Sequence, residues 1–128
     1  MSTNKLIFPE LSYTITGILF ATHNELGPYA REKQYGDLIE KSLKGAKILF
    51  QRECSLGDSG NIMDFVIDGK IILELKAKRI LTKDDYLQLQ RYLQESQLPL
   101  GLLVNFRNKY IKPVRVIRTN QSVRISSN

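Results

Sequence analysis

The chain of 128 residues contains one cysteine and one histidine, and this scarcity excludes several kinds of site. With Cys54 alone an intramolecular disulfide cannot form, which favours a reducing compartment and predicts a cytoplasmic location. Cys54 also lacks the histidine-rich surroundings of a nucleophilic thiol. The only histidine, His23, comes late in an expected helix, where a favourable interaction with the helix dipole explains it as well as a role as a base does. Neither GxxxxGK[ST] nor GxGxxG occurs, so no nucleotide phosphate loop is expected.

Long apolar runs are also missing. No run approaches the roughly 18 residues that a membrane span needs, and the first nine residues lack the pattern of a signal peptide. The hydrophobic fraction of 42% and the charged fraction of 25% are ordinary for a globular protein. We therefore expect one domain, residues 1–128, without contact to a membrane.

Acidic residues are missing from the last part of the chain. Residues 1–64 hold 7 Lys or Arg and 8 Asp or Glu, whereas residues 65–128 hold 12 and 5. Beyond Gly101 there are only cations: Arg107, Lys109, Lys112, Arg115, Arg118 and Arg124. This polarity suits a polyanionic partner such as nucleic acid, although it also suits a merely solubilising surface.

Hydrophobic periodicity predicts an α/β fold in the order α-α-β-β-β-α-β-β. A stripe from Leu11 to Leu26 predicts a first helix that ends at Gly27-Pro28, and residues 31–44 predict a second. Strands are expected at residues 46–53, 62–67 and 70–77, the last two joined at Asp68-Gly69. Thr82 is the expected N-cap of a third helix, with Asp85 as its capping-box partner. Further strands are expected at residues 100–106 and 112–119, and residues 121–128 either add a short edge strand or fray. Because a helix separates strands, we expect a central mixed sheet flanked by helices.

The sharpest chemical pattern is Asp64 followed by Glu74 and Lys76. Cleavage of a phosphodiester needs a divalent metal, and Mg²⁺ is held by a few hard carboxylate oxygens. A lysine two residues from a carboxylate on a strand points to the same face, where it can orient a water or stabilise charge at phosphorus. The alternation of residues 70–78 is equally that of a plain amphipathic strand with one wet face.

The motifs of the chain, taken in order, resemble those of the GxxExxY family, within the PD-(D/E)XK nuclease-like superfamily. The resemblance spans residues 11–117 and rests on HNELGP at 23–28, Glu32-x-x-Tyr35, Met63-Asp64-Phe65, ILELKA at 72–77, Gln88-Leu89-x-x-Tyr92-Leu93 and GLLVNF at 101–106. It implies a restriction-endonuclease-like core.

The resemblance also implies roles for individual residues. Asp64 and Glu74 correspond to metal-binding carboxylates, Lys76 to the catalytic lysine and Glu32 to a further metal-binding acid on a helix. Gln88 and Tyr92 correspond to the QxxxY motif of RecB-like nucleases. Each has an ordinary alternative, a solvated helix residue for Glu32 and Gln88 and a core aromatic for Tyr92 and Tyr35. The chain departs from the family at Tyr29, where the family has glycine, and at Met63, where the superfamily has proline.

A shared metal restricts the register of the expected hairpin. Asp64 and Glu74 must lie on one face, so the numbers of opposed residues must add to an even value. A three-residue loop, 67–69, meets this condition and predicts Asp64 opposite Ile72.

These patterns predict a nuclease that uses Mg²⁺, or Mn²⁺, to cleave nucleic acid, DNA in preference to RNA. Glu32, Asp64 and Glu74 would hold the metal, Lys76 would act in catalysis, and Gln88 and Tyr92 would support the site. The backbone of the substrate would lie on Arg107, Lys109, Lys112, Arg115 and Arg118. Two alternatives remain: a non-catalytic module that binds nucleic acid or a partner, and a phosphohydrolase of small nucleotides.

Overall fold

The computed structural model describes residues 7–119. Three helices and five strands follow one another in the expected order. Their bounds are α1 (Pro9–Leu26), α2 (Glu32–Gly45), β1 (Phe50–Ser55), β2 (Ile62–Ile67), β3 (Ile71–Lys76), α3 (Lys83–Ser96), β4 (Leu100–Asn105) and β5 (Val114–Ile117).

The strands form one mixed sheet in the order β1-β2-β3-β4-β5. Only β3 and β4 are parallel, because α3 lies between them in the chain and returns it to the same end of the sheet. The other neighbouring strands are antiparallel. The expected α/β fold with a central mixed sheet is confirmed, and it agrees with a restriction-endonuclease-like core.

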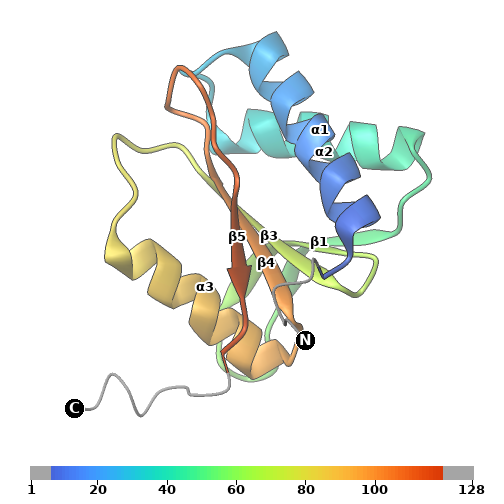
Figure 1. Cartoon of the computed structure of the whole chain (residues 1–128), viewed down its shortest axis with the longest axis vertical. Coiled ribbons are helices and arrows are strands. Elements are labelled where there is room, and N and C mark those ends of the chain that lie inside the picture. The colour runs from blue at the N-terminus through green and yellow to red at the C-terminus, as the bar shows by residue number, and fades with distance from the viewer. Residues whose placement is uncertain (1–6, 120–128) are drawn as a thin grey trace.

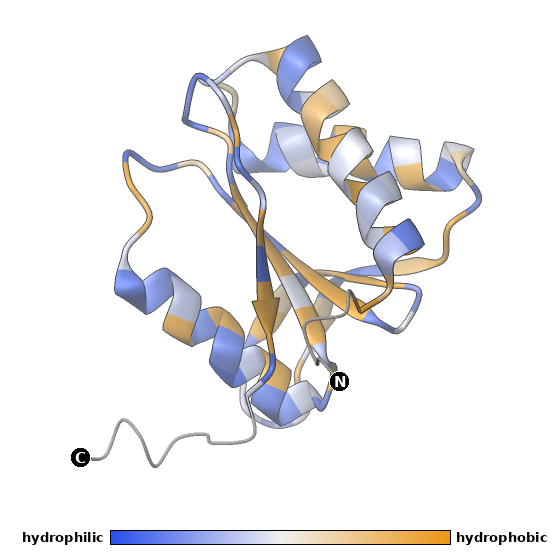
Figure 2. Ribbon diagram, in the orientation of Figure 1, coloured by the Kyte–Doolittle hydropathy of each residue, from blue (hydrophilic) through white to orange (hydrophobic). Residues whose placement is uncertain are grey.

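The helices cover the two faces of the sheet, α1 and α2 on one and α3 on the other (Figure 1). Each face carries its own hydrophobic cluster, one with Leu19 and Ile39 and the other with Leu89 and Leu93. Hydrophobic residues follow the strands, whereas the helices also carry polar residues (Figure 2). The third strand is therefore buried on both faces, and the alternative interpretation of residues 70–78 as a plain amphipathic strand with one wet face is wrong.

Two strands differ from their expected bounds. Strand β1 begins at Phe50 rather than at residue 46, because Ala46, Lys47 and Ile48 donate backbone hydrogen bonds to carbonyls at the end of α2. Those residues complete the helix terminus and are not available for a ladder. Strand β5 is shorter than expected, since it pairs with β4 only over residues 114–117. The strand expected after residue 120 lies outside the described residues.

The two expected signals that end and begin helices are confirmed. Gly27 has φ 75° and donates its N–H to the His23 carbonyl at 2.8 Å, which terminates α1. The Thr82 N–H donates to Asp85 Oδ2 at 2.7 Å at the start of α3. Within residues 7–119, no helix is both long enough and apolar enough to cross a membrane.

Candidate active site

The candidate site lies where β2 and β3 separate. Their antiparallel ladder runs from Ile67 opposite Ile71 to Phe65 opposite Leu73 and stops there. Beyond that point β2 continues with β1, and β3 continues with β4 as far as Lys76 opposite Asn105. Asp64 and Glu74 are the next residues on the two diverging strands, so both stand at the opening of this gap.

The register has the expected parity but not the expected pairing. Opposed residues add to an even number, and the same register continued by one step brings Asp64 opposite Glu74 rather than opposite Ile72. The turn consists of residues 68–70, with Asp68 at φ 55° and Gly69 at φ 63°. The Lys70 N–H donates to the Ile67 carbonyl at 2.9 Å. The loop has three residues, as expected, but it lies one position later in the chain, with Lys70 in place of Ile67, and this moves the pairing by one position on each strand.

Strand β2 is irregular at Asp64. Met63 packs in the cluster on the α3 face, whereas Phe65, two residues later, packs in the cluster on the α1 and α2 face. In a regular strand these two side chains would share a face. Glu53, on the neighbouring strand at the position that faces Asp64, has φ 54°, an unusual conformation for a residue other than glycine. This local distortion turns Asp64 toward the gap.

Side chains replace the missing ladder in this gap. The Asp64 N–H donates to Glu74 Oε2 at 2.8 Å, and the Leu75 N–H donates to Asp64 Oδ2 at 2.8 Å. Glu74 is only 4% exposed. Burial, and then the charge of Asp64, raise the pKa of Glu74 to about 8. Burial also raises the pKa of Asp64. The two carboxyl groups together therefore hold a proton more strongly than isolated carboxyl groups do.

Lys76 lies two residues beyond Glu74 and contacts α3. Its Nζ donates to Gln88 Oε1 at 3.1 Å and lies 3.8 Å from Asp85 Oδ1. Asp85 also binds Lys78 Nζ at 2.9 Å. Although burial opposes ionisation, the Thr82 N–H and Lys78 hold the pKa of Asp85 below its usual range. The ammonium group of Lys76 is thus directed by the first turns of α3.

The two remaining candidates, Glu32 and Tyr92, lie at the edges of this group. Glu32 begins α2, and its pKa is raised by partial desolvation and by the charge of Asp64. Tyr92 is buried on α3, and its pKa is raised by burial and then by the charges of Glu74 and Asp64. The structure therefore brings all six candidates from the sequence into one electrostatic neighbourhood.

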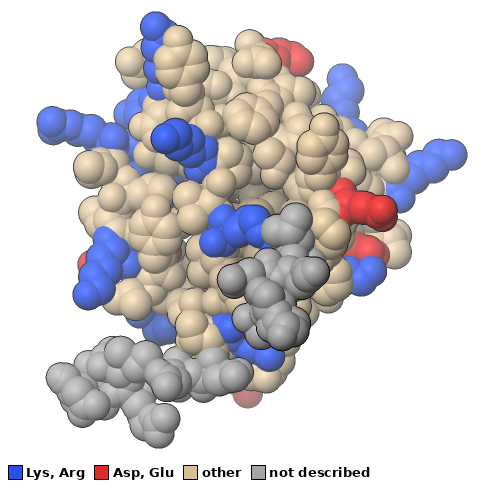
Figure 3. All heavy atoms as spheres, viewed as in Figure 1, with Lys and Arg blue, Asp and Glu red and all other residues tan. Residues whose placement is uncertain are grey.

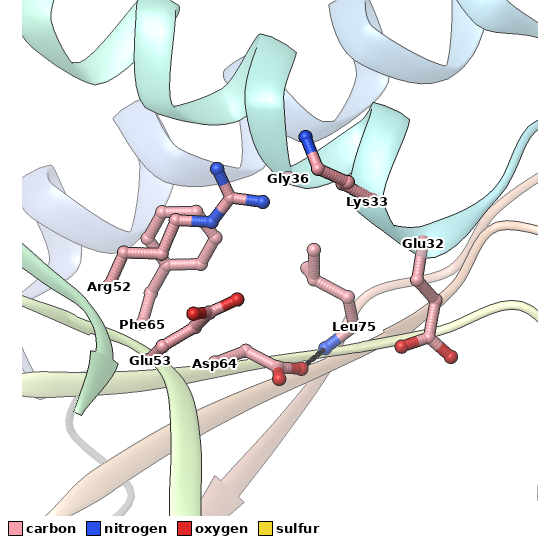
Figure 4. A pocket seen from close by; sticks show the side chains of 8 residues that line it. All are labelled: Glu32, Lys33, Gly36, Arg52, Glu53, Asp64, Phe65 and Leu75. Carbon is pink, nitrogen blue, oxygen red and sulfur yellow. Dashed lines mark hydrogen bonds between the residues drawn. The ribbon is translucent and has the colours of Figure 1, made fainter. Parts of the chain in front are cut away.

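A cavity of about 250 Å³ opens on the α2 side of Asp64 (Figure 4). It contains three charged residues that the sequence analysis did not indicate, Lys33, Arg52 and Glu53. Glu74 and Lys76 do not line it, because they belong to the opposite side of β3. The lining consists of Glu32, Lys33, Gly36, Arg52, Glu53, Asp64, Phe65 and Leu75.

Arg52 is held in this cavity by α2. Its Nη1 binds Asp37 Oδ1 at 2.7 Å and Glu40 Oε1 at 3.0 Å. A Cβ atom at Gly36 would lie 2.4 Å from Arg52 Nη2, so this glycine makes room for the guanidinium. This contact could not be predicted from the sequence, because it joins Gly36 on α2 to a residue on β1; Gly36 lies inside a helix, where glycine is otherwise unfavourable.

The donor atoms at the gap fit a hard divalent cation. Asp64 and Glu74 offer carboxylate oxygens, and burial is the main reason that the pKa of both groups is raised, so a bound cation would favour their charged forms. Mg²⁺ needs only one or two carboxylates because it retains several waters. Among residues 7–119, no three His, Cys, Asp or Glu side chains are close enough to form a complete ligand set. Asp64 and Glu74 are therefore the pair that would hold an ion, and Glu32 lies near this pair.

The five candidate cations for binding nucleic acid differ in their surroundings. Lys109 and Lys112 are exposed. Arg107 donates to the carbonyls of Pro28 and Ala77, at 3.2 and 3.3 Å. Arg115 instead binds α1, with Nη1 2.8 Å from Ser12 Oγ. Arg118 follows β5 and is partly buried. On the face of the molecule that Figure 3 shows, Lys and Arg side chains are more frequent than Asp and Glu side chains.

Two other residues of the sequence motifs, Tyr35 and His23, make contacts that hold the fold together. The Tyr35 hydroxyl donates to the Gly27 carbonyl, and its ring stacks on Phe106 with centroids 4.1 Å apart. His23 is buried, with Nε2 2.8 Å from the Asn108 carbonyl oxygen. Both residues connect the end of α1 and the α1–α2 turn to the segment after β4. Neither residue reaches the gap between β2 and β3.

A mixed sheet that presents paired carboxylates and a lysine on a hairpin defines a restriction-endonuclease-like protein. The sequence model of the PD-(D/E)XK nuclease superfamily matches residues 9–118, and the chain therefore belongs to that superfamily. No curated protein and no solved structure matches the chain significantly. Members of this superfamily are generally nucleases that typically use divalent metals, which supports a nuclease-like function with nucleic acid as substrate.

Proposed function

We propose that this protein is a Mg²⁺-dependent nuclease, with Mn²⁺ as a possible substitute, that hydrolyses phosphodiester bonds at the gap between β2 and β3. The single observation that carries the proposal is the hydrogen bond that joins the two acidic residues there: the Asp64 N–H donates to Glu74 Oε2 at 2.8 Å. Two carboxyl groups so placed, with a lysine two residues away, match the needs of metal-assisted phosphodiester hydrolysis.

The residues of the site would have different roles in the reaction. Asp64 and Glu74 would hold the ion, which supplies charge neutralisation and a water of lowered pKa when bound. Lys76 would orient the attacking water or stabilise the charge that develops at phosphorus. Gln88 would position Lys76, to which it is hydrogen-bonded at 3.1 Å. Glu32 would add a third carboxyl group beside Asp64 and Glu74. Tyr92 would pack behind Glu74.

Membership of the GxxExxY family is part of this proposal. The motifs in their order support it, and so does the position of Tyr35, whose hydroxyl binds the turn that precedes Glu32. The QxxxY motif at Gln88 and Tyr92 is similar to that of RecB-like nucleases and favours DNA over RNA. The proposed location is the cytoplasm, which the single cysteine favours because the chain forms no intramolecular disulfide.

The test is an assay of cleavage with purified full-length protein. Labelled single-stranded DNA, duplex DNA and RNA are each incubated with Mg²⁺, with Mn²⁺ or with EDTA. We expect products only with a divalent ion and faster cleavage of DNA. Binding without cleavage under every metal condition would contradict the proposal and leave a non-catalytic nucleic-acid-binding module.

A further inference from the structure

Tyr29 is an exposed aromatic residue beside the candidate site. It lies between α1 and α2, and 81% of its surface is accessible. The Arg107 guanidinium lies over its ring, with Cζ 5.6 Å from the ring centroid. Arg107 also donates to the carbonyls of Pro28 and Ala77, so three separate segments meet at this point.

These contacts fix Tyr29 close to the proposed chemistry. Ala77 directly follows Lys76. Its backbone lies close enough to the Glu32 carboxyl group to offset a small part of the rise that burial causes in the pKa of Glu32. Glu32 itself comes three residues after Tyr29, at the start of α2. The ring of Tyr29 thus lies at the end of the sheet where β3 ends, among the connections that form the rim of that end.

Three connections form this rim, namely residues 27–31, 77–82 and 106–113 (Figure 1). Asn105 joins two of them, because its side chain accepts from the Lys78 N–H at 3.0 Å and donates to the Lys78 carbonyl at 2.7 Å. The rim carries a second exposed tyrosine, Tyr110, with Lys109 Nζ 5.4 Å from its ring centroid. Each of these two aromatic rings is therefore paired with a cation.

A water-exposed aromatic ring beside a cation is the arrangement that binds an unpaired nucleobase. The ring stacks on the base, and the cation contacts the backbone or the π system. Bases inside a duplex are stacked on one another and do not offer a free face. We propose that the rim at Tyr29 binds unpaired nucleotides, with Tyr29 as the principal stacking platform and Tyr110 as a second one. The substrate is accordingly a single strand, or an unpaired region next to a duplex.

Tyr13 provides a matched control. It is also 81% exposed, but it lies in the first turns of α1, away from the rim. Exposure alone would give Tyr13 and Tyr29 the same effect on binding, whereas the proposed stacking requires only Tyr29.

This inference names the substrate class of the proposed nuclease, and its test measures binding without cleavage. Full-length protein is titrated in EDTA into a labelled oligothymidylate of about 12 nucleotides, within the range that small single-strand-binding folds occupy. The comparison ligands are an abasic strand of the same length and a duplex. The variants are Tyr29→Ala, Tyr29→Phe and Tyr13→Ala, each checked for an unchanged melting temperature.

We expect Tyr29→Ala to weaken binding of the oligothymidylate about tenfold, as loss of one stacked base predicts. Tyr29→Phe and Tyr13→Ala are expected to bind as the wild type does, and Tyr29→Ala is expected to leave duplex and abasic binding unchanged. The inference is overturned if the wild type binds the abasic strand as tightly as the oligothymidylate, if it binds no unpaired strand, or if Tyr29→Ala and Tyr13→Ala bind equally. Because no cleavage is needed, loss of Tyr29-dependent binding and loss of nuclease activity are separate outcomes.

Discussion

Glu74 Oε2 accepts a hydrogen bond from the backbone N–H of Asp64 at 2.8 Å, across the point where the two strands of the hairpin separate. The contact joins a buried carboxyl group to the backbone of the residue that carries the second one. It places the two acidic residues together at the end of the hairpin ladder, whereas burial, and then the charge of Asp64, raise the pKa of Glu74.

The first prediction concerns the stability of the metal-free protein. The pKa of Glu74 is raised to about 8, so the folded state binds this proton more tightly than the unfolded chain does. The stabilisation is therefore complete at a pH below the unfolded pKa, about 4.3, and is lost as the pH rises through 8. Urea unfolding in EDTA is expected to show a lower free energy of unfolding at pH 8 than at pH 6, by up to about 1.4 kcal/mol per pH unit.

The control for this prediction is Glu74→Gln, which keeps an oxygen that can accept from the Asp64 N–H but does not titrate. Its pH dependence is expected to be clearly flatter over the same interval. Equal slopes for the two proteins would show that Glu74 does not titrate as its surroundings imply.

The second prediction concerns Asp85, which binds the start of α3 and two lysines. Asp85→Asn removes the charge that accepts from the Thr82 N–H and from Lys78. Because buried charge-assisted hydrogen bonds are lost, we expect a cost of about 1–3 kcal/mol in the free energy of unfolding. Lys78→Ala is the matched variant, since it removes a partner that is 42% exposed and is expected to cost less than about 1 kcal/mol. Comparable costs in thermal or urea unfolding would contradict this assignment.

The third prediction concerns the contact of Gly36 with Arg52. Ala in place of Gly36 favours the helix by up to about 1 kcal/mol but displaces the guanidinium from its two acidic partners. In a background of Arg52→Ala the same change has nothing to displace. A double-mutant cycle is expected to give a coupling energy of about 1 kcal/mol, with Gly36→Ala more favourable when Arg52 is absent. A coupling energy near zero would mean that the side chain of Arg52 moves aside without loss.

The fourth prediction separates cations that bind nucleic acid from one that binds α1. Lys109 and Lys112 are exposed, so replacing both by Gln is expected to reduce the log–log salt slope for a single strand by about 1.4. Arg115→Gln is expected instead to lower the melting temperature, because its Nη1 binds Ser12 Oγ. An unchanged salt slope in the double variant would remove Lys109 and Lys112 from the interface.

Much of this architecture could be predicted from the sequence because the signals are local. Periodicity placed all three helices, the bounds of β2 were as expected, and Thr82 with Asp85 marked the start of α3. The requirement that two acids share a metal predicted the even register, although the loop was displaced by one residue on each strand.

The rest depends on contacts between segments that are distant in the chain. The Asp64 side chain points into the gap beside Glu53, whose φ is positive. A positive φ at glutamate cannot be predicted from the residue type. Arg52 reaches Gly36 only because β1 lies against α2. The start of β1 was missed because residues 46–48 bond to the end of α2, where local propensity favours a strand. Register and local distortion are therefore properties of the assembled sheet.

The most direct measurement is the rate of metal-dependent cleavage by Glu74→Gln and by Lys76→Met, relative to the wild type under identical conditions. Glu95→Gln and Lys83→Met, on α3, are controls with the same chemical changes. The account predicts that each site variant stays folded and loses at least about 100-fold in rate, as expected when a group that stabilises the transition state is removed. It also predicts that each control cleaves like the wild type. Cleavage at the wild-type rate by either folded site variant would contradict the assignment of Asp64, Glu74 and Lys76 as the active site.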